Sequence, residues 1–214
     1  MTLPTPHGDK LIALLQNEKL PSGDRVNLQQ SLERYRLWLT SLKQIPTGLN
    51  DVENSVRLLN EYRTFVDLEL IFDSESDFLH RQRGQLKLDN SVVEEFLPHL
   101  VSIVFPELST IFRTGPQLCF SALYFSSTIR TPLSSPGART RTKNQDFSIS
   151  KRVYLRSSFH PNHEEAVDHL EVNLGYLNAE CKTNLDKTMF QEACATAHDV
   201  KAAVPGSKYV LLCD

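Results

Sequence analysis

The chain has 214 residues, 40% of them hydrophobic and 23% charged, a composition typical of a globular protein with a sizeable core. Its formal net charge of −3 argues against binding nucleic acid through total charge, so phosphate contacts would need local clusters of Lys and Arg. The four cysteines form no CxxC pair and indicate neither a disulfide framework nor a zinc site. The sequence shows no leader and no run of about 18 apolar residues, which predicts a cytoplasmic protein without a membrane span.

The first half of the chain is predicted to be mainly helical. Apolar residues recur at steps of three and four through residues 24–45, which places one apolar stripe along a helix. Breakers containing proline and glycine flank this segment on both sides. Two more helices are predicted from capping residues and the same periodicity, one from residue 50 or 51 to 66 and one from residue 90 or 91 to 100.

After about Gly115 the pattern changes to short runs of β-branched and aromatic residues, which predict strands. The predicted strands are 117–125, 147–155, 174–183 and 208–213, and a helix is predicted over 185–204. Residues 126–144, rich in Ser, Thr, Pro, Gly and Arg, are expected to form a loop. This order predicts an α/β core with a mixed sheet, flanked by helices.

Two regions are therefore expected, a helical N-terminal region over residues 1–80 and an α/β core over residues 81–214. The chain ends within an apolar run typical of a strand, so we expect a C-terminal part of the core to be absent from it.

Positive charge is concentrated in two short segments. The first contains Arg81, Arg83 and Lys87, and the second contains Arg130, Arg139, Arg141 and Lys143. Either cluster suits phosphate binding, and a solvent-exposed loop explains each of them equally well.

The predicted strand 174–183 contains a carboxylate and an ammonium group two positions apart, Glu180 and Lys182. Alternate side chains of a strand share a face, so these two are expected to lie side by side, with Leu174, Tyr176 and Asn178 on the same face. Such a pair suits metal-assisted cleavage of a phosphodiester. The carboxylate would hold a divalent cation, and the lysine would orient or deprotonate the attacking water.

The triplet alone is weak support for a site. A second acidic-x-Lys triplet, residues 199–201, falls in a predicted helix, where positions two apart do not face each other. A hard cation also needs a further carboxylate. Asp146, which opens the predicted strand 147–155, is either a turn-forming residue or the partner of Glu180, if the two strands meet at one end.

Three segments in order carry a resemblance to known nucleases: Lys143-Asn144-Gln145-Asp146-Phe147, Ala179-Glu180-Cys181-Lys182-Thr183-Asn184-Leu185-Asp186-Lys187, and Pro205-Gly206-Ser207-x-Tyr209. The arrangement resembles the PD-(D/E)xK nucleases, with Gln145 in place of the proline, and the spacing is similar to that of the subunits of BbvCI-type restriction endonucleases. The resemblance covers residues 140–214 and, more loosely, residues 85–105.

The resemblance implies a PD-(D/E)xK restriction-endonuclease-like α/β fold and a Mg²⁺-dependent type II enzyme of the bacterial cytoplasm that cuts double-stranded DNA. Enzymes of this kind cut a short asymmetric site with two related subunits, so a heterodimer is implied, with a homodimer as the other possibility. Asp146 and Glu180 are then metal-binding catalytic carboxylates, Lys182 is the catalytic lysine, and the backbone carbonyl of Cys181 is a further ligand. Glu95 is either a helix-borne metal ligand or an exposed acid.

Arg139, Arg141 and Lys143 are predicted to approach the DNA, with Arg81 and Arg83 as weaker candidates. Two alternatives stay open: a non-catalytic DNA-binding or assembly subunit that uses its leucine-striped helix as an interface, and a repair or recombination nuclease on the same core. The histidines and acids of residues 160–169 fit no zinc spacing and are expected to be a solvent-facing insertion.

Overall fold

The computed structural model describes residues 3–73 and 78–213, without the side chains of residues 82–85. The chain forms two compact units, Met1–Thr110 and Ile111–Asp214. The first unit extends beyond the expected helical region 1–80 because a long helix, α5 (Leu88–Val104), packs against α1 (Pro6–Leu15) and α3 (Val52–Thr64). Within the described ranges, no helix has the length and apolar character needed to cross a membrane.

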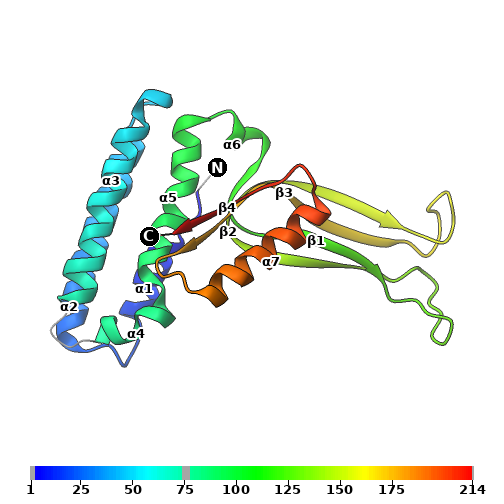
Figure 1. The fold of residues 1–214 in the computed structure, drawn as a ribbon, viewed down its shortest axis with the longest axis horizontal. Coiled ribbons are helices and arrows are strands. Elements are labelled where there is room, and N and C mark those ends of the chain that lie inside the picture. Colours follow the sequence, from blue (N-terminus) through cyan, green and yellow to red (C-terminus); the bar gives the residue numbers. More distant parts are fainter. Residues whose placement is uncertain (1–2, 74–77, 214) are drawn as a thin grey trace. The chain divides into compact units, whose positions relative to one another are not determined.

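The first unit is helical throughout its described residues (Figure 1). Besides α1, α3 and α5 it contains α2 (Ser22–Gln44), a 3-10 turn η1 (Leu49–Asp51), a π-helix η2 (Phe65–Phe72), α4 (Phe78–Leu86) and α6 (Leu108–Ile111). The helices predicted from periodicity are confirmed as α2, α3 with η2, and α5. Their apolar stripes form one core with α1, lined by Leu11, Leu28, Leu42, Val66, Leu70 and Val92 among others.

A polar network is buried inside this core and is centred on His7 of α1. Nε2 of His7 lies 2.9 Å from the Tyr62 hydroxyl, and Nδ1 lies 3.1 Å from the Leu88 carbonyl oxygen. Burial lowers the pKa of His7 to about 3, so its ring is neutral and carries one proton. A carbonyl oxygen only accepts, so this proton is on Nδ1, and Nε2 accepts from the Tyr62 hydroxyl. His7 thus ties α1 to both α3 and α5.

The second unit contains a four-stranded mixed sheet in the order β1-β2-β3-β4. The strands are β1 (Arg113–Phe125), β2 (Ala138–Ser157), β3 (Asp168–Lys182) and β4 (Lys208–Cys213). Neighbours are antiparallel except β3 and β4, which are parallel because α7 (Lys187–Ala203) connects them as a crossover. The predicted α/β core with a mixed sheet is confirmed, and α7 packs on β1 and β4 (Figure 1).

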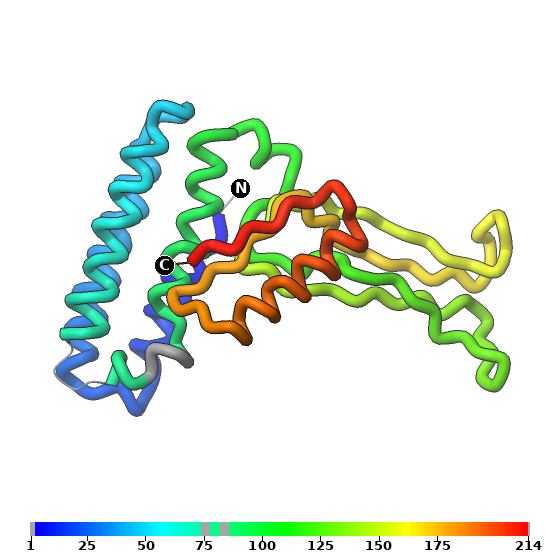
Figure 2. Tube along the Cα trace, in the orientation of Figure 1, coloured from blue at the N-terminus to red at the C-terminus, as the bar shows by residue number. Residues whose placement is uncertain are grey.

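The prediction of a loop over residues 126–144 is wrong for residues 138–144, which belong to β2. β2 already begins at Ala138, and its first residues pair with β1 through Phe125↔Ala138 and Cys119↔Lys143. The residues between alternate Arg and Thr, a polar pattern that reads as a loop although the β-branched threonines suit a strand. The turn between β1 and β2 is therefore limited to residues 126–137, and it lies at the same end of the sheet as the turn 158–167 between β2 and β3 (Figure 2).

Strict alternation along β3 is interrupted at Tyr176. Ile149 of β2 pairs with Leu177, but Ser150 pairs with Gly175, so Tyr176 is an extra residue in the ladder, a β-bulge. The buried Asn178 amide donates to the Gly175 carbonyl oxygen at 3.3 Å, and a Cβ at Gly175 would overlap this amide. The expected shared face is thus shortened: Asn178, Glu180 and Lys182 keep it, and the bulge separates Leu174 and Tyr176 from them.

Candidate active site

β2 and β3 bring two carboxylates together where their paired segment ends: Asp146 lies in the interior of β2, and Glu180 lies near the C-terminal end of β3. Phe147 pairs with Ala179 in the antiparallel ladder, Asp146 precedes Phe147, and Glu180 follows Ala179. Antiparallel register therefore places Asp146 and Glu180 at the same end of the strand pair. Oδ2 of Asp146 accepts a hydrogen bond of 2.8 Å from the backbone N–H of Cys181, which fixes Asp146 beside the Glu180–Lys182 segment.

Glu180 is held at both of its carboxylate oxygens. Oε1 lies 2.7 Å from Nζ of Lys182, and Oε2 accepts a hydrogen bond of 3.0 Å from the Tyr209 hydroxyl. The sequence predicted no role for Tyr209 beyond its place in a matching motif. The contact arises from the parallel pairing of β4 with β3, in which Tyr209 lies opposite Asn178.

The site is partly shielded from water and negatively charged. The side chains of Lys182 and Glu180 are 20% and 19% exposed. Burial lowers the pKa of Lys182, but the hydrogen bond and charge of Glu180, with the charges of Asp146 and Glu192, outweigh it and raise the pKa above its usual value. Burial, followed by the charge and hydrogen bond of Glu180, also raises the pKa of Tyr209. Lys182 is therefore an ammonium group and Tyr209 a neutral donor at neutral pH.

The donor set of this site suits a hard cation. Asp146 and Glu180 offer carboxylate oxygens, and the described part of the chain contains no group of three or more His, Cys, Asp or Glu side chains able to hold a metal. Mg²⁺ is commonly held by one or two carboxylates and completes its shell with water and phosphate. Zinc sites instead use several His and Cys ligands. The residues present thus fit Mg²⁺.

The basic residues of β2 differ in their surroundings. Lys143 and Arg141 lie 3.1 and 3.7 Å from Oδ2 of Asp199 on α7. The hydrogen bond from Lys143, with the positive charge of Arg141, lowers the pKa of Asp199. Arg141 and Lys143, the two basic residues that most closely precede Asp146 in sequence, therefore connect the sheet to α7. Arg139 faces solvent.

The remaining predicted residues belong to the helical unit. Glu95 is fully buried, so the expectation of an exposed acid is wrong. Its Oε1 accepts from the Tyr35 hydroxyl at 2.6 Å, and its Oε2 accepts from the backbone N–H of His7 at 2.9 Å, contacts that give Glu95 a structural role in this unit. Arg81 is exposed on α4, and the side chain of Arg83 lies outside the described residues.

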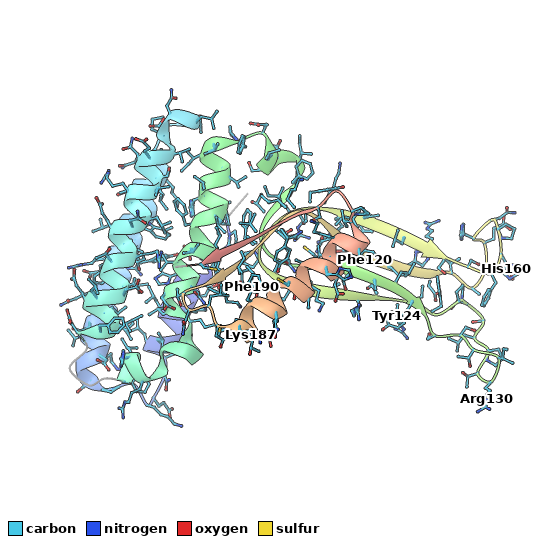
Figure 3. The ribbon with its side chains drawn as sticks, viewed as in Figure 1. Phe120, Tyr124, Arg130, His160, Lys187 and Phe190 are labelled. Carbon is cyan, nitrogen blue, oxygen red and sulfur yellow. The ribbon has the colours of Figure 1, made fainter. Side chains whose placement is uncertain are left out.

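The histidines of residues 160–169 form no metal site in the described part of the chain. His160 and His163 are exposed in the turn between β2 and β3, and Figure 3 shows His160 at the end of that turn. The predicted solvent-facing insertion is confirmed for residues 160–165, which are exposed in this turn, but Asp168 and His169 belong to β3.

Comparison with known proteins gives a match over the part of the chain that contains this site. A family model described as Bpu10I restriction endonuclease matches residues 85–214, which is more than half of the sequence. The chain belongs to the Bpu10I restriction endonuclease family. The matched range of this family includes Asp146, Glu180, Lys182 and Tyr209, and it also includes α5 of the helical unit.

The chain of this Bpu10I-family protein also resembles a solved structure. The chain is similar to a structure described as "native BbvCI A2B2 tetramer at low resolution", with a TM-score of 0.62 and 19% sequence identity, over 96% of this chain and 73% of that chain. The resemblance to BbvCI-type enzymes and the restriction-endonuclease-like α/β fold are thereby confirmed. A search of curated proteins gave no match.

Proposed function

We propose that this Bpu10I-family chain is a catalytic subunit of a type II restriction endonuclease that hydrolyses one strand of a short duplex DNA site with Mg²⁺. The observation that carries the proposal is the cluster formed by the interior of β2 and the C-terminal end of β3, where Asp146 contacts the backbone of Cys181 and Glu180 contacts Lys182. The family match favours restriction over repair or recombination.

Each residue of the cluster has a distinct role in this proposal. Asp146 and Glu180, with the backbone carbonyl of Cys181, would hold Mg²⁺, which when bound supplies positive charge to the phosphate oxygens. Lys182, an ammonium beside Glu180, orients the attacking water and stabilises negative charge on the phosphate. Tyr209 is a positioning residue, because its hydroxyl donates to Glu180 and restrains that carboxylate.

The proposed partners are double-stranded DNA and a second subunit. The similar BbvCI assembly is described as an A2B2 tetramer, with two kinds of subunit. Two different subunits suit an asymmetric DNA site, since an isologous homodimer presents the same surface twice and favours palindromes. Arg139, the exposed cation that precedes the catalytic segment of β2, is the favoured DNA contact near the site, ahead of Arg141 and Lys143.

The test is nicking of supercoiled plasmid with Mg²⁺ by the full chain, with and without the product of any adjacent gene. Asp146→Asn keeps an oxygen that accepts from the Cys181 N–H but removes the charge, and Lys182→Ala removes the ammonium. Each is expected to lower the nicking rate by at least about a hundredfold, or ~2.7 kcal/mol. Lys201→Ala, an exposed lysine of the other acidic-x-Lys triplet, is the matched control and should cut normally.

Equal cutting by the wild type and both site variants would refute the assignment of these residues. Duplex binding without nicking, even when the second subunit is supplied, would favour the non-catalytic DNA-binding subunit instead.

A further inference from the structure

The turn between β1 and β2 presents an apolar and a cationic side chain at its apex. Ile129 is fully exposed to solvent at 101% of its reference area, and Arg130 follows it. Figure 3 shows Arg130 at the end of this turn, at the far end of the strands from Phe190 of α7. A fully exposed isoleucine adds no hydrophobic stabilisation to the isolated fold, since its apolar area stays in water.

The turn is ordered by its own hydrogen bonds. Thr128 and Thr131 bracket the apex with a hydroxyl pair at 2.7 Å, and the Thr131 N–H donates to the Thr128 hydroxyl at 3.0 Å. At its base, Asp168 of β3 accepts from the Ser135 hydroxyl at 2.6 Å and from the Ala138 N–H at 2.8 Å. Ile129 and Arg130 are thus held out by a defined structure.

The hairpin that carries this turn is positively charged. Residues 113–145 contain five basic residues and no acidic one, although the whole chain has a net charge of −3. Within the hairpin, Arg130, Arg139 and Arg141 are exposed, and Arg141 and Lys143 form ion pairs with Asp199. Asp199 and Asp168, from other elements, offset part of this charge at the base of the hairpin, and Arg130 lies at the apex. An exposed cation at the tip of a basic hairpin favours a polyanion over a protein partner of ordinary composition.

We infer that the β1–β2 turn is a second DNA contact, in which Arg130 binds phosphate and Ile129 enters the major groove. This rests on the proposed function. The major groove admits a two-stranded β-ribbon, and an apolar side chain there can contact thymine methyl groups.

The reach of the turn sets where this contact falls. β2 runs without interruption from Ala138 at the turn to Asp146 at the site, eight residues further on. At ~3.4 Å per residue this separates the base of the turn from the site by about 27 Å, or about eight base pairs of duplex, and the apex with Ile129 and Arg130 extends beyond that base.

The test measures binding of the full chain to a fluorescein-labelled duplex of about 40 base pairs of mixed sequence, which exceeds the expected reach on both sides. All proteins carry Lys182→Ala, so that the duplex is not cut. Added to this parent are Arg130→Ala, Ile129→Ala, and the matched controls Arg36→Ala and Leu37→Ala, an exposed cation and an exposed leucine on α2. Affinity is measured by fluorescence anisotropy over a range of salt concentrations.

Arg130→Ala is expected to weaken binding about tenfold and to reduce the slope of log affinity against log salt by about one, since one phosphate contact is lost. Ile129→Ala is expected to weaken binding about three- to tenfold without changing this slope, because an apolar contact releases no counterions. The α2 controls should match the parent.

If the parent binds the duplex and both turn variants bind equally well with the same salt slope, the turn contact is refuted and the proposed function stands. If the turn variants bind DNA normally but alter the sedimentation coefficient of the protein, the turn contacts a protein instead, and the inference is also overturned. Failure of the parent to bind duplex would remove both the turn contact and the proposed function.

Discussion

Acidification is expected to destabilise the helical unit through His7, and the surroundings of His7 give the size of the effect. Burial lowers the pKa of His7 from 6.5 to about 3, a shift increased by the charge of Lys10 and opposed by the hydrogen bond to Leu88. Between these two values the unfolded chain binds a proton that the folded unit excludes. The free energy of unfolding therefore falls as the pH drops from 6.5 towards 3.

The gap between the two pKa values, at ~1.4 kcal/mol per pH unit, corresponds to about 5 kcal/mol, of which about 3 kcal/mol is lost by pH 4.5. This is a large part of the ~5–15 kcal/mol typical of a domain. Glu95 has the opposite effect, because burial raises its pKa and acid then favours the folded form. A comparison of two proteins that both contain Glu95 cancels this contribution to first order.

Trp38 is the single tryptophan of the chain and stacks on Tyr62, at 4.8 Å between ring centroids, so its fluorescence reports unfolding of this unit. Urea unfolding of the wild type and His7→Gln is measured from pH 7 to 4.5. The stability of the wild type relative to the variant should fall by ~1.4 kcal/mol for each pH unit below 6.5. Parallel pH profiles would refute the reasoning. So would an NMR titration of wild-type His7 with a pKa near 6.5, a measurement that does not depend on the variant folding.

Three further substitutions test the packing and the site. Gly8→Ala places a Cβ against the Tyr35 hydroxyl and should lower the free energy of unfolding, measured in urea, by about 1–3 kcal/mol. Gly23 is a helical glycine with open space around it, so Gly23→Ala should raise this free energy by about 0.5–1 kcal/mol. A loss of stability at both positions would contradict the packing argument. Tyr209→Phe removes the donor to Glu180 and should lower plasmid nicking about 10–100-fold, with a higher Mg²⁺ requirement. An unchanged Mg²⁺ titration would show that Tyr209 does not position Glu180.

Periodicity predicted most of the architecture because each long element buries one face. The stripe of α2 and the apolar run of β4 are recognisable from local spacing alone. α1 was not predicted, because it is short and includes His7 and Gly8, whose places in the core depend on distant partners, Tyr62 and Tyr35. The first residues of β2 were misassigned because their pairing with β1 is not encoded in an apolar pattern.

Only those residues of the candidate site that lie in local sequence motifs could be predicted. Asp146, Glu180 and Lys182 were found from a resemblance and from strand alternation, and the structure brings them together. The contact of Tyr209 with Glu180 and the ion pairs of Asp199 with β2 join segments far apart in sequence, so local spacing contains no signal for them. Glu95 shows the reverse error, since a helix acid with no visible partner in the sequence has three donors in the fold.

The unbroken run of β2 from Ala138 to Asp146 cannot change in length without moving Asp146, whereas the turn that precedes it can. Inserting one residue into this run would turn the side chains beyond it to the opposite face of the sheet and remove Asp146 from Glu180. The turn 126–137 is closed at its base by bonds between Ser126 and Gly137, so a change in its length does not shift the β1–β2 register. A different turn would therefore change the proposed DNA contacts and leave the pairing that places Asp146 beside Cys181 unchanged.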